Sequence, residues 1–417
     1  MDGLLQPGPV ASAVVSHADR DADYGNTITR HGGKDEQCRA RNTPRAIAGM
    51  KGGTGEFSYT RNSRFQSAAI KILQPILEQE IGELNVDDWM DGSAVCIADF
   101  GCSVGANTLE YAEICFQSVQ ECHRVKSSEV IKPPVQYFFC DLPSNDFNTL
   151  FRQLEEWRDS QRMNLYAAAV PGSFYGRLFP SRSLHVAISI LALQWMSQVP
   201  DAVVDRASPA YNSGRVWIDR TKNTAALEAY VQTARQDLRN FLLARAEEVV
   251  SGGFILFFIV GRTDESHPEN QWNEEGLYAG PYSIVFESTW EELVVEGIID
   301  EERRDSFNVP VYCHSVGEVR AVAESTNAFE IKQLQIQRLS FGTPDEAEQL
   351  LAAPEQYGQF MRNFTRALLN SYMVEHIGEQ STAEFFNRFE RNVAAAVREG
   401  RIPGVFMDCL LAILVRK

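Results

Sequence analysis

The most constraining feature of this chain is a strand, a glycine turn, a helix and a second strand in close succession. Residues 94–100 (AVCIADF) predict a buried strand of a parallel sheet that ends at Gly101. Apolar spacing predicts a helix over residues 106–118, and residues 135–140 (VQYFFC) predict a second strand that is stopped before Pro143. This order is the beginning of a doubly wound α/β fold.

The alternation continues along the chain. Further strands are predicted at residues 165–170, 183–190, 254–260 and 404–415, and amphipathic helices at 63–84, where Pro75 should kink the helix, and at 223–250. The pattern predicts a mostly parallel sheet with helices on both faces. We divide the chain into a flexible N-terminal extension (1–45), a sheet domain (46–265 and 385–417) and a mainly helical cap (266–384), which carries aromatic residues without a βαβ period.

Composition excludes several classes of protein. The 417 residues carry a formal net charge of −17, which argues against binding the phosphate backbone of a nucleic acid. No apolar run approaches the roughly 18 residues that a membrane helix needs. The eight cysteines form no CxxC pair, so we expect free thiols and a cytoplasmic location. His123, His185, His314 and His376 show no metal-ligand spacing, and no metal site is predicted from them.

The turn after the first strand carries the motif D-x-G-x-x-x-G, formed by Asp99, Gly101 and Gly105. Glycine there lets the backbone approach a ligand, and a carboxylate at the end of a parallel strand faces the crevice where such sheets bind ligands. The motif lacks the third glycine of a dinucleotide site and the GK[ST] of a P-loop, which disfavours an NAD-linked oxidoreductase. It is typical of S-adenosylmethionine methyltransferases. Asp141 ends the next strand, where it is either a ligand of a cofactor ribose or a turn aspartate.

Longer motifs resemble one family, SABATH, the plant-type salicylate, benzoate and theobromine methyltransferases. They are MKGGTGEFSY at residues 50–59, IADFGCSVGAN at 97–107, DLPSNDFN at 141–148, PGSFYGRLFP at 171–180 and LQWMSQVP at 193–200, followed by FNVP at 307–310 and EHIG at 375–378. The resemblance extends from about residue 47 to the end of the chain. It implies a Rossmann-like class I methyltransferase fold with a helical cap over the active site.

The resemblance also implies roles for residues at matching positions. Those expected around S-adenosylmethionine, which the sheet domain would bind, are Lys51, Tyr59, Ser63, Asp99, Gly101, Asn107, Asp141, Leu142, Ser173 and Phe174. Gln66 and Trp195 would hold the carboxylate of a small-molecule acid through an amide and an indole N–H. A carboxylic acid is already ionised at neutral pH, so positioning it in line with the methyl group would suffice for direct displacement, giving a methyl ester.

Two residues depart from the salicylate pattern. Leu191 replaces a pocket tyrosine and Gln194 replaces a methionine or histidine, so we expect a substrate pocket suited to an acid with a larger aliphatic or polycyclic body. The alternatives are an N-methyltransferase acting on a purine-like ring nitrogen and a catalytically silent cofactor-binding scaffold. The resemblance further suggests a homodimer, and acidic residues at 273–275 or 300–305 are candidates for binding magnesium.

Overall fold

The computed structural model describes residues 50, 64–85, 93–127, 132–161, 165–272, 280–340, 343–402 and 404–417. All of them belong to one compact unit, residues 44–417. The expected N-terminal extension at residues 1–45 lies outside the described residues.

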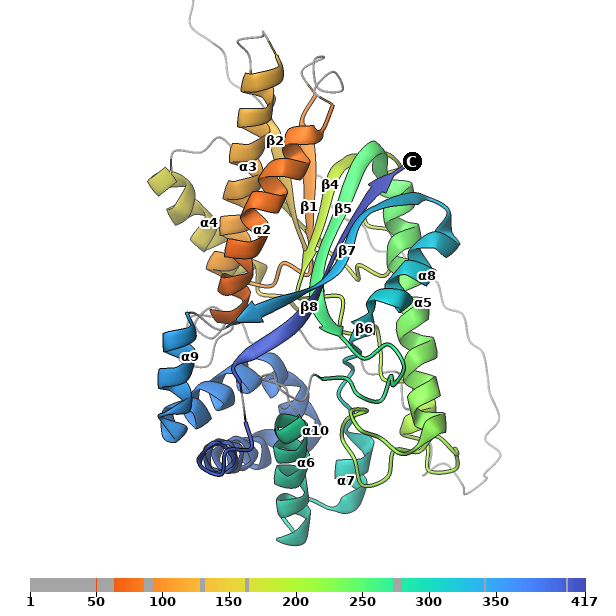
Figure 1. Cartoon of the computed structure of the whole chain (residues 1–417), viewed down its shortest axis with the longest axis vertical. Helices are drawn as coiled ribbons and strands as arrows, with labels where there is room; N and C mark the ends of the chain where they lie inside the picture. Colours follow the sequence, from red (N-terminus) through yellow and green to blue (C-terminus); the bar gives the residue numbers. More distant parts are fainter. Residues whose placement is uncertain are drawn as a thin grey trace, which may run out of the picture. The chain divides into compact units, whose positions relative to one another are not determined.

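One central sheet organises the described part of the chain (Figure 1). Its main strand order is β3-β2-β1-β4-β5-β8-β7, and a short strand, β6, pairs with β5. Strands β1 to β5 run parallel, whereas β8 is antiparallel to both β5 and β7. The predicted mostly parallel α/β sheet is therefore confirmed. The strands are β1 (Val95–Phe100), β2 (Val135–Asp141), β3 (Leu165–Pro171), β4 (Leu184–Ile190), β5 (Val249–Arg262), β6 (His314–Ser315), β7 (Phe329–Ser340) and β8 (Phe406–Arg416).

Helices cover both faces of this sheet, as the alternation predicts. On one face lie α2 (Arg64–Glu83), α3 (Ala106–Lys126) and α4 (Phe147–Gln161), and on the other lie α5 (Thr224–Glu248) and α8 (Val316–Thr326) (Figure 1). A hydrophobic core lies on each face of the sheet. Successive strand residues contribute to the two cores in turn, because side chains along a strand point to opposite faces. Ile97 packs in the first core and Phe100 in the second. Pro75 lies inside α2 without ending it, and Leu73 and Leu77 beside it are fully buried, so packing offsets the lost helical bond.

A second group of helices lies beyond the carboxyl ends of the parallel strands (Figure 1). It contains α6 (Gly280–Val295), α7 (Glu301–Ser306), α9 (Pro344–Leu351) and α10 (Pro354–Arg398). Aromatic rings join α6 to α10, with centroids 5.5 Å apart for Tyr282 and Phe389 and 5.1 Å for Phe286 and Phe385. The helical geometry of α10 breaks at Gly378, whose φ is 80°. None of the described helices is both long and apolar enough to cross a membrane.

The structure corrects the predicted extent of the cap at two stretches. Residues 314–340, assigned to the helical cap, form β6, α8 and β7, and β7 pairs with β8 along its whole length. β7 is an edge strand with one partner, and polar side chains such as Gln333 and Gln337 alternate with apolar ones along it. This alternation is the period of a half-exposed strand, and the helix-rich assignment of the segment overlooks it. The helices beyond the sheet therefore come from two insertions, one before β6 and one between β7 and β8. Residues 385–398, assigned to the sheet domain, form the last part of α10 instead. The boundaries near residues 45 and 265 stay predictions.

Candidate active site

The site begins at the turn after β1, next to the end of β4. The strand order reverses between these two strands, and such a switch point leaves a crevice outside the carboxyl ends. Gly101 has a φ of +86°, and a Cβ on it would lie 2.3 Å from the Cβ of Ala192, which follows β4. Only glycine lets these two turns approach so closely. The backbone N–H groups of Gly101 and Cys102 both donate to the carbonyl of Cys140, at 2.8 and 3.2 Å.

Asp141 is held rigidly at the end of β2. Its two carboxylate oxygens accept hydrogen bonds from the backbone N–H groups of Ser103 and Leu142, both at 2.7 Å. Burial raises the pKa of this carboxyl to about 6, and the two N–H groups oppose that rise. Each oxygen keeps a lone pair that can accept from a ligand hydroxyl.

Asp99 lies near the end of β1, and Asn107 lies in the first turn of α3. The Asp99 side chain is only 3% exposed and accepts a hydrogen bond from the Thr108 hydroxyl at 2.6 Å, which ties β1 to the first turn of α3. Neither Asp99 nor Asn107 is among the residues that line the cavities described below. A positioning role for Asp99 behind the glycine turn fits these contacts better than direct contact with a ligand.

A cavity of about 240 Å³ opens over the glycine turn. The ends of β1, β2, β3 and β4 supply one wall and α10 supplies another. Ser103 contributes a buried hydroxyl that has no hydrogen-bond partner among the described residues. We call this the cofactor cavity; its lining includes Met50, Gly101, Ser103, Asp141, Leu142, Ser173, Phe174, Tyr175, Leu191, Ala192, Trp195, Met196, Ser197, Pro310, Leu368, Leu369 and Tyr372.

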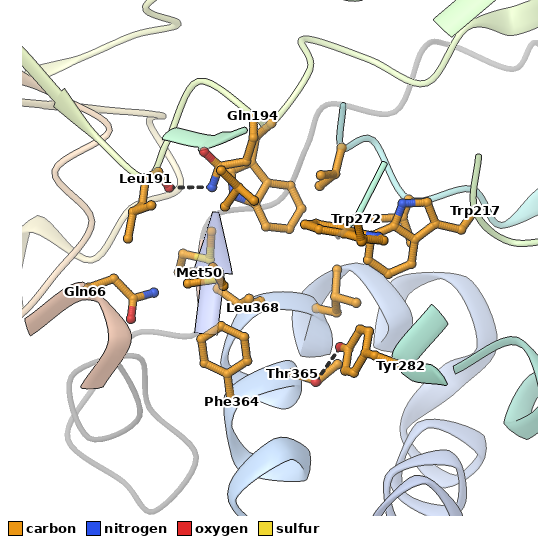
Figure 2. A pocket seen from close by; sticks show the side chains of 16 residues that line it. Met50, Gln66, Leu191, Gln194, Trp217, Trp272, Tyr282, Phe364, Thr365 and Leu368 are labelled. Carbon is orange, nitrogen blue, oxygen red and sulfur yellow. Dashed lines mark hydrogen bonds between the residues drawn. The ribbon is translucent and has the colours of Figure 1, made fainter. Parts of the chain in front are cut away.

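A smaller cavity of about 60 Å³ adjoins it and is mostly apolar (Figure 2). Gln66 enters from α2, Leu191 and Gln194 from the loop after β4, and side chains of α6 and α10 close the far side. We call this the acceptor cavity; its lining includes Met50, Gln66, Leu191, Gln194, Trp195, Trp217, Val260, Trp272, Tyr282, Val309, Val311, Phe364, Thr365, Leu368, Leu369 and Met407.

Polar groups in the acceptor cavity are few and neutral among the described residues. The Tyr282 and Thr365 hydroxyls bond to each other at 2.7 Å. The Gln194 amide nitrogen donates to the Leu191 carbonyl at 2.7 Å (Figure 2). The amide oxygens of Gln66 and Gln194 are buried without a hydrogen-bond partner in the described part of the chain. The cavity thus offers amide, indole and hydroxyl groups inside an apolar wall.

Trp195 lines both cavities and is fixed through its backbone. Its N–H donates to the Ala192 carbonyl at 3.0 Å, and its carbonyl accepts from the Tyr175 hydroxyl at 2.6 Å. This second hydrogen bond connects the 171–180 loop to the loop that carries Trp195. Tyr175 also lines the cofactor cavity. The wall between the two cavities is therefore held in place from the cofactor side.

A buried ion pair on α5 holds the backbone of the 171–180 loop. Arg245 and Glu248 on α5 bond at 2.7 Å, and both side chains are fully buried. The Arg245 guanidinium also donates to the carbonyls of Phe174 (2.8 Å) and Gly176 (2.9 Å), while Glu248 accepts from the backbone N–H groups of Leu178 and Phe179. The guanidinium further packs 4.0 Å from the ring centroid of Phe100, just before the glycine turn.

The structure brings most of the predicted site residues together. Gly101, Asp141, Leu142, Ser173 and Phe174 line the cofactor cavity, Gln66 and Gln194 line the acceptor cavity, and Leu191 and Trp195 line both. Lys51, Tyr59 and Ser63 lie outside the described residues.

Sequence reasoning missed the far side of the acceptor cavity. Trp217, Trp272, Tyr282 and Thr365 lie in the loop after β4, the loop after β5, α6 and α10. None belongs to a recognisable motif. Only the aromatic content of the stretch without βαβ alternation could have drawn attention to Trp272 and Tyr282, and no sequence signal marks Trp217 or Thr365.

A sequence model described as SAM dependent carboxyl methyltransferase matches residues 46–413. The chain belongs to this family, the SABATH methyltransferases. It is therefore an S-adenosylmethionine-dependent methyltransferase, and the family, fold and cofactor predictions are confirmed.

Similar proteins include both O- and N-methyltransferases. Gibberellic acid methyltransferase 2 of Arabidopsis thaliana is 33% identical over 84% of this chain and 89% of its own length. Indole-3-acetate O-methyltransferase 1 of Oryza sativa subsp. japonica is 37% identical over 84% and 88%. 3,7-dimethylxanthine N-methyltransferase 1 of Coffea arabica is 31% identical over 88% and 96%. Among solved structures, loganic acid methyltransferase with SAH superposes with a TM-score of 0.77 at 31% identity, over 88% of this chain and 98% of that one.

The cofactor cavity of this SABATH methyltransferase suits S-adenosylmethionine. The Asp141 carboxylate has lone pairs that can accept from two ribose hydroxyls. The Ser103 hydroxyl makes no hydrogen bond to the described residues, so it is available to a ligand. Leu142 and Phe174 add apolar surface for a purine ring. Gly101 keeps the floor of the cavity clear, since a Cβ there would also lie 3.4 Å from the Phe174 ring.

The candidate magnesium positions gain no support from the described residues. Asp300 caps α7 by accepting from the Arg303 N–H. The Asp305 carboxylate accepts from the Gly214 N–H at 2.9 Å and from the Arg304 guanidinium at 2.8 Å. No group of three or more His, Cys, Asp or Glu that could hold a metal occurs in the described part of the chain. Residues 273–275 lie outside it.

The buried Asp99 predicts a pH-dependent stability for the ligand-free enzyme. Burial raises its pKa from 3.8 to about 7, so the folded protein keeps a proton that the unfolded chain releases. The resulting stabilisation is complete below about pH 4 and is lost as the pH rises through about 7. The Asp99→Asn variant keeps an acceptor for Thr108 but has no proton to release. Between about pH 4 and pH 7, we expect its free energy of unfolding to fall by about 1–3 kcal/mol less than that of the wild type. Urea unfolding at several pH values measures this difference. Equal pH slopes for both proteins would contradict the prediction.

Proposed function

We propose that this enzyme transfers a methyl group to the carboxylate of a small-molecule acid and forms a methyl ester. The observation that carries the proposal is the position of Gln66 and Trp195, which line one apolar cavity beside the cofactor cavity. In this proposal the Gln66 amide and the Trp195 indole N–H donate to the two oxygens of the carboxylate. Both donors are neutral, so they orient the anion without the strong charge-assisted bond that would reduce its nucleophilicity.

The remaining cofactor assignments belong to the same proposal. Asp141 would accept from the ribose hydroxyls, and Leu142, Ser173 and Phe174 would contact the rest of the cofactor. Lys51, Tyr59, Ser63 and Asn107 keep the roles that the family resemblance implies, whereas Asp99 would act through the glycine turn. The homodimer and the cytoplasmic location stay predictions.

In this reaction the protein mainly has to position the carboxylate and exclude water from it. S-adenosylmethionine, when bound, supplies a methyl group already activated by the sulfonium charge. A carboxylic acid is ionised at neutral pH and needs no base. Aliphatic side chains such as Leu191, Val309 and Val311 exclude water around the acceptor, and Trp195 fixes its direction toward the cofactor cavity. Such positioning can be worth roughly 7–11 kcal/mol in well-oriented reactions.

The shape of the acceptor cavity favours an acid with a cyclic body. Aromatic rings from Trp217, Trp272 and Tyr282 form its far side, and Leu191 provides an aliphatic wall where the salicylate-type enzymes carry tyrosine. The names of the relatives, which refer to gibberellic acid, indole-3-acetate and loganic acid, agree with ring-containing acids. N-methylation of a ring nitrogen is the second candidate, because one relative is named as a dimethylxanthine N-methyltransferase.

The decisive experiment is methyl transfer from methyl-labelled S-adenosylmethionine to a panel of ring-containing carboxylic acids and xanthines, followed by mild alkali. We expect label to be released as methanol, because an ester is hydrolysed under these conditions and an N-methyl group is not. Alkali-stable label would instead support the N-methyltransferase. Cofactor binding without transfer to any compound of the panel would favour the silent scaffold.

A further inference from the structure

The buried amide of Gln194 has only one of its two ends satisfied. Its side chain is 7% exposed, and its nitrogen donates to the Leu191 carbonyl at 2.7 Å (Figure 2). If the Gln194 amide were flipped, its oxygen would face the Leu191 carbonyl oxygen, and two acceptors cannot form a hydrogen bond. The contact therefore fixes which end of the amide is the nitrogen. The Gln194 oxygen is therefore the end left free, and it has no hydrogen-bond partner among the described residues.

A buried carbonyl oxygen of this kind needs a donor when the cavity is filled and dry, because an unsatisfied polar group in an apolar site is costly. The described side chains around it do not supply one. One of the Tyr282 and Thr365 hydroxyls donates to the other, and Val260, Val309 and Leu368 are apolar. The indole N–H groups of Trp195, Trp217 and Trp272 line the same cavity, but none of them donates to the Gln194 oxygen. The donor must then come from the bound molecule or from a trapped water.

We propose that Gln194 is a specificity-determining residue that selects acids carrying an O–H or N–H group on their ring body, in addition to the carboxyl group. The inference rests on the proposed carboxyl methylation. Gln194 directly precedes Trp195 and lines the same cavity, so one molecule can meet both side chains. An acid without the second donor leaves the Gln194 oxygen unpaired, whereas a methionine at this position would tolerate it.

Matched pairs of acids test this selection. Suitable pairs are indole-3-acetic acid with its benzofuran analogue, in which ring oxygen replaces N–H, and hydroxycyclohexane carboxylic acids with cyclohexane carboxylic acid. For at least one pair, we expect kcat/KM to favour the donor-bearing acid by about 10- to 100-fold. Calorimetric affinities for the complex with S-adenosylhomocysteine should show the same preference.

Gln194→Met removes the acceptor while keeping side-chain length, and should reduce this preference to within about threefold. Gln194→Leu is the second variant if the first fails to fold. Met407→Leu is the matched control, since it alters an apolar residue of the same cavity and should change both members of a pair alike.

The outcomes separate this inference from the proposed function. If acids become esters but no pair differs by more than about threefold, a water satisfies the Gln194 oxygen and the inference is overturned. A preference that persists in Gln194→Met overturns it as well. If no acid becomes an ester while xanthines are methylated, the proposed function fails and this inference falls with it.

Discussion

Replacing Trp195 by Phe should lower kcat/KM for the carboxylic acid by about 10- to 100-fold, the range expected when one hydrogen bond to a charged group is lost. Phenylalanine keeps an aromatic ring on the wall between the two cavities but removes the indole N–H. The backbone contacts with Ala192 and Tyr175 do not depend on the side chain and should persist. Steady-state kinetics with the best acid of the panel measures the effect.

Cofactor affinity separates a role in holding the acid from general damage. The dissociation constant for S-adenosylhomocysteine should change by less than about threefold, since Trp195 contributes only one part of a cavity formed by many residues. Trp157→Phe on α4 is the matched control, because Trp157 packs against the core and is not among the residues lining either cavity. Unchanged turnover of Trp195→Phe would rule out the assigned role.

The sheet could be predicted from the sequence because its central strands are buried on both faces. Continuous apolar runs such as 94–100 and 254–260 leave few alternatives to a strand between glycine turns. The edge strand β7 carries the alternation of a half-exposed strand, but it lies between α8 and α9, and the helical pattern of these neighbours outweighs that short signal. Pro75 shows the opposite case, since local propensity favours an end to the helix there, whereas α2 continues through it.

The cofactor half of the site was predictable and the acceptor half only partly so. Gly101 and Asp141 are marked by their place directly after strands, where any sheet of this kind binds ligands. Trp217, Tyr282 and Thr365 reach the cavity through an insertion and long loops, so their meeting point depends on tertiary packing rather than on local pattern. Asp99 is marked by the same motif, but its carboxylate accepts from Thr108 and the residue does not line the cofactor cavity. Its contact with the cofactor therefore stays a prediction.

The largest effect on stability is expected at Arg245. Replacing it by Met should lower the free energy of unfolding by about 3–5 kcal/mol, because Glu248 then remains buried without its cationic partner. The carbonyls of Phe174 and Gly176 also lose their donors, so the loop that lines the cofactor cavity loses support. Urea unfolding measures the first effect, and calorimetry should show at least about tenfold weaker binding of S-adenosylhomocysteine.

A second substitution distinguishes the stranded charge from the lost loop contacts. In Arg245→Met with Glu248→Gln, the buried charge is gone while the glutamine oxygen can still accept from Leu178 and Phe179, so part of the stability should return. Cofactor affinity should stay low, because the donors to the 171–180 loop remain absent. Arg235→Met, an exposed change on the same helix, should alter neither quantity. Recovery of affinity together with stability would mean that Arg245 acts on the cavity only by keeping the protein folded.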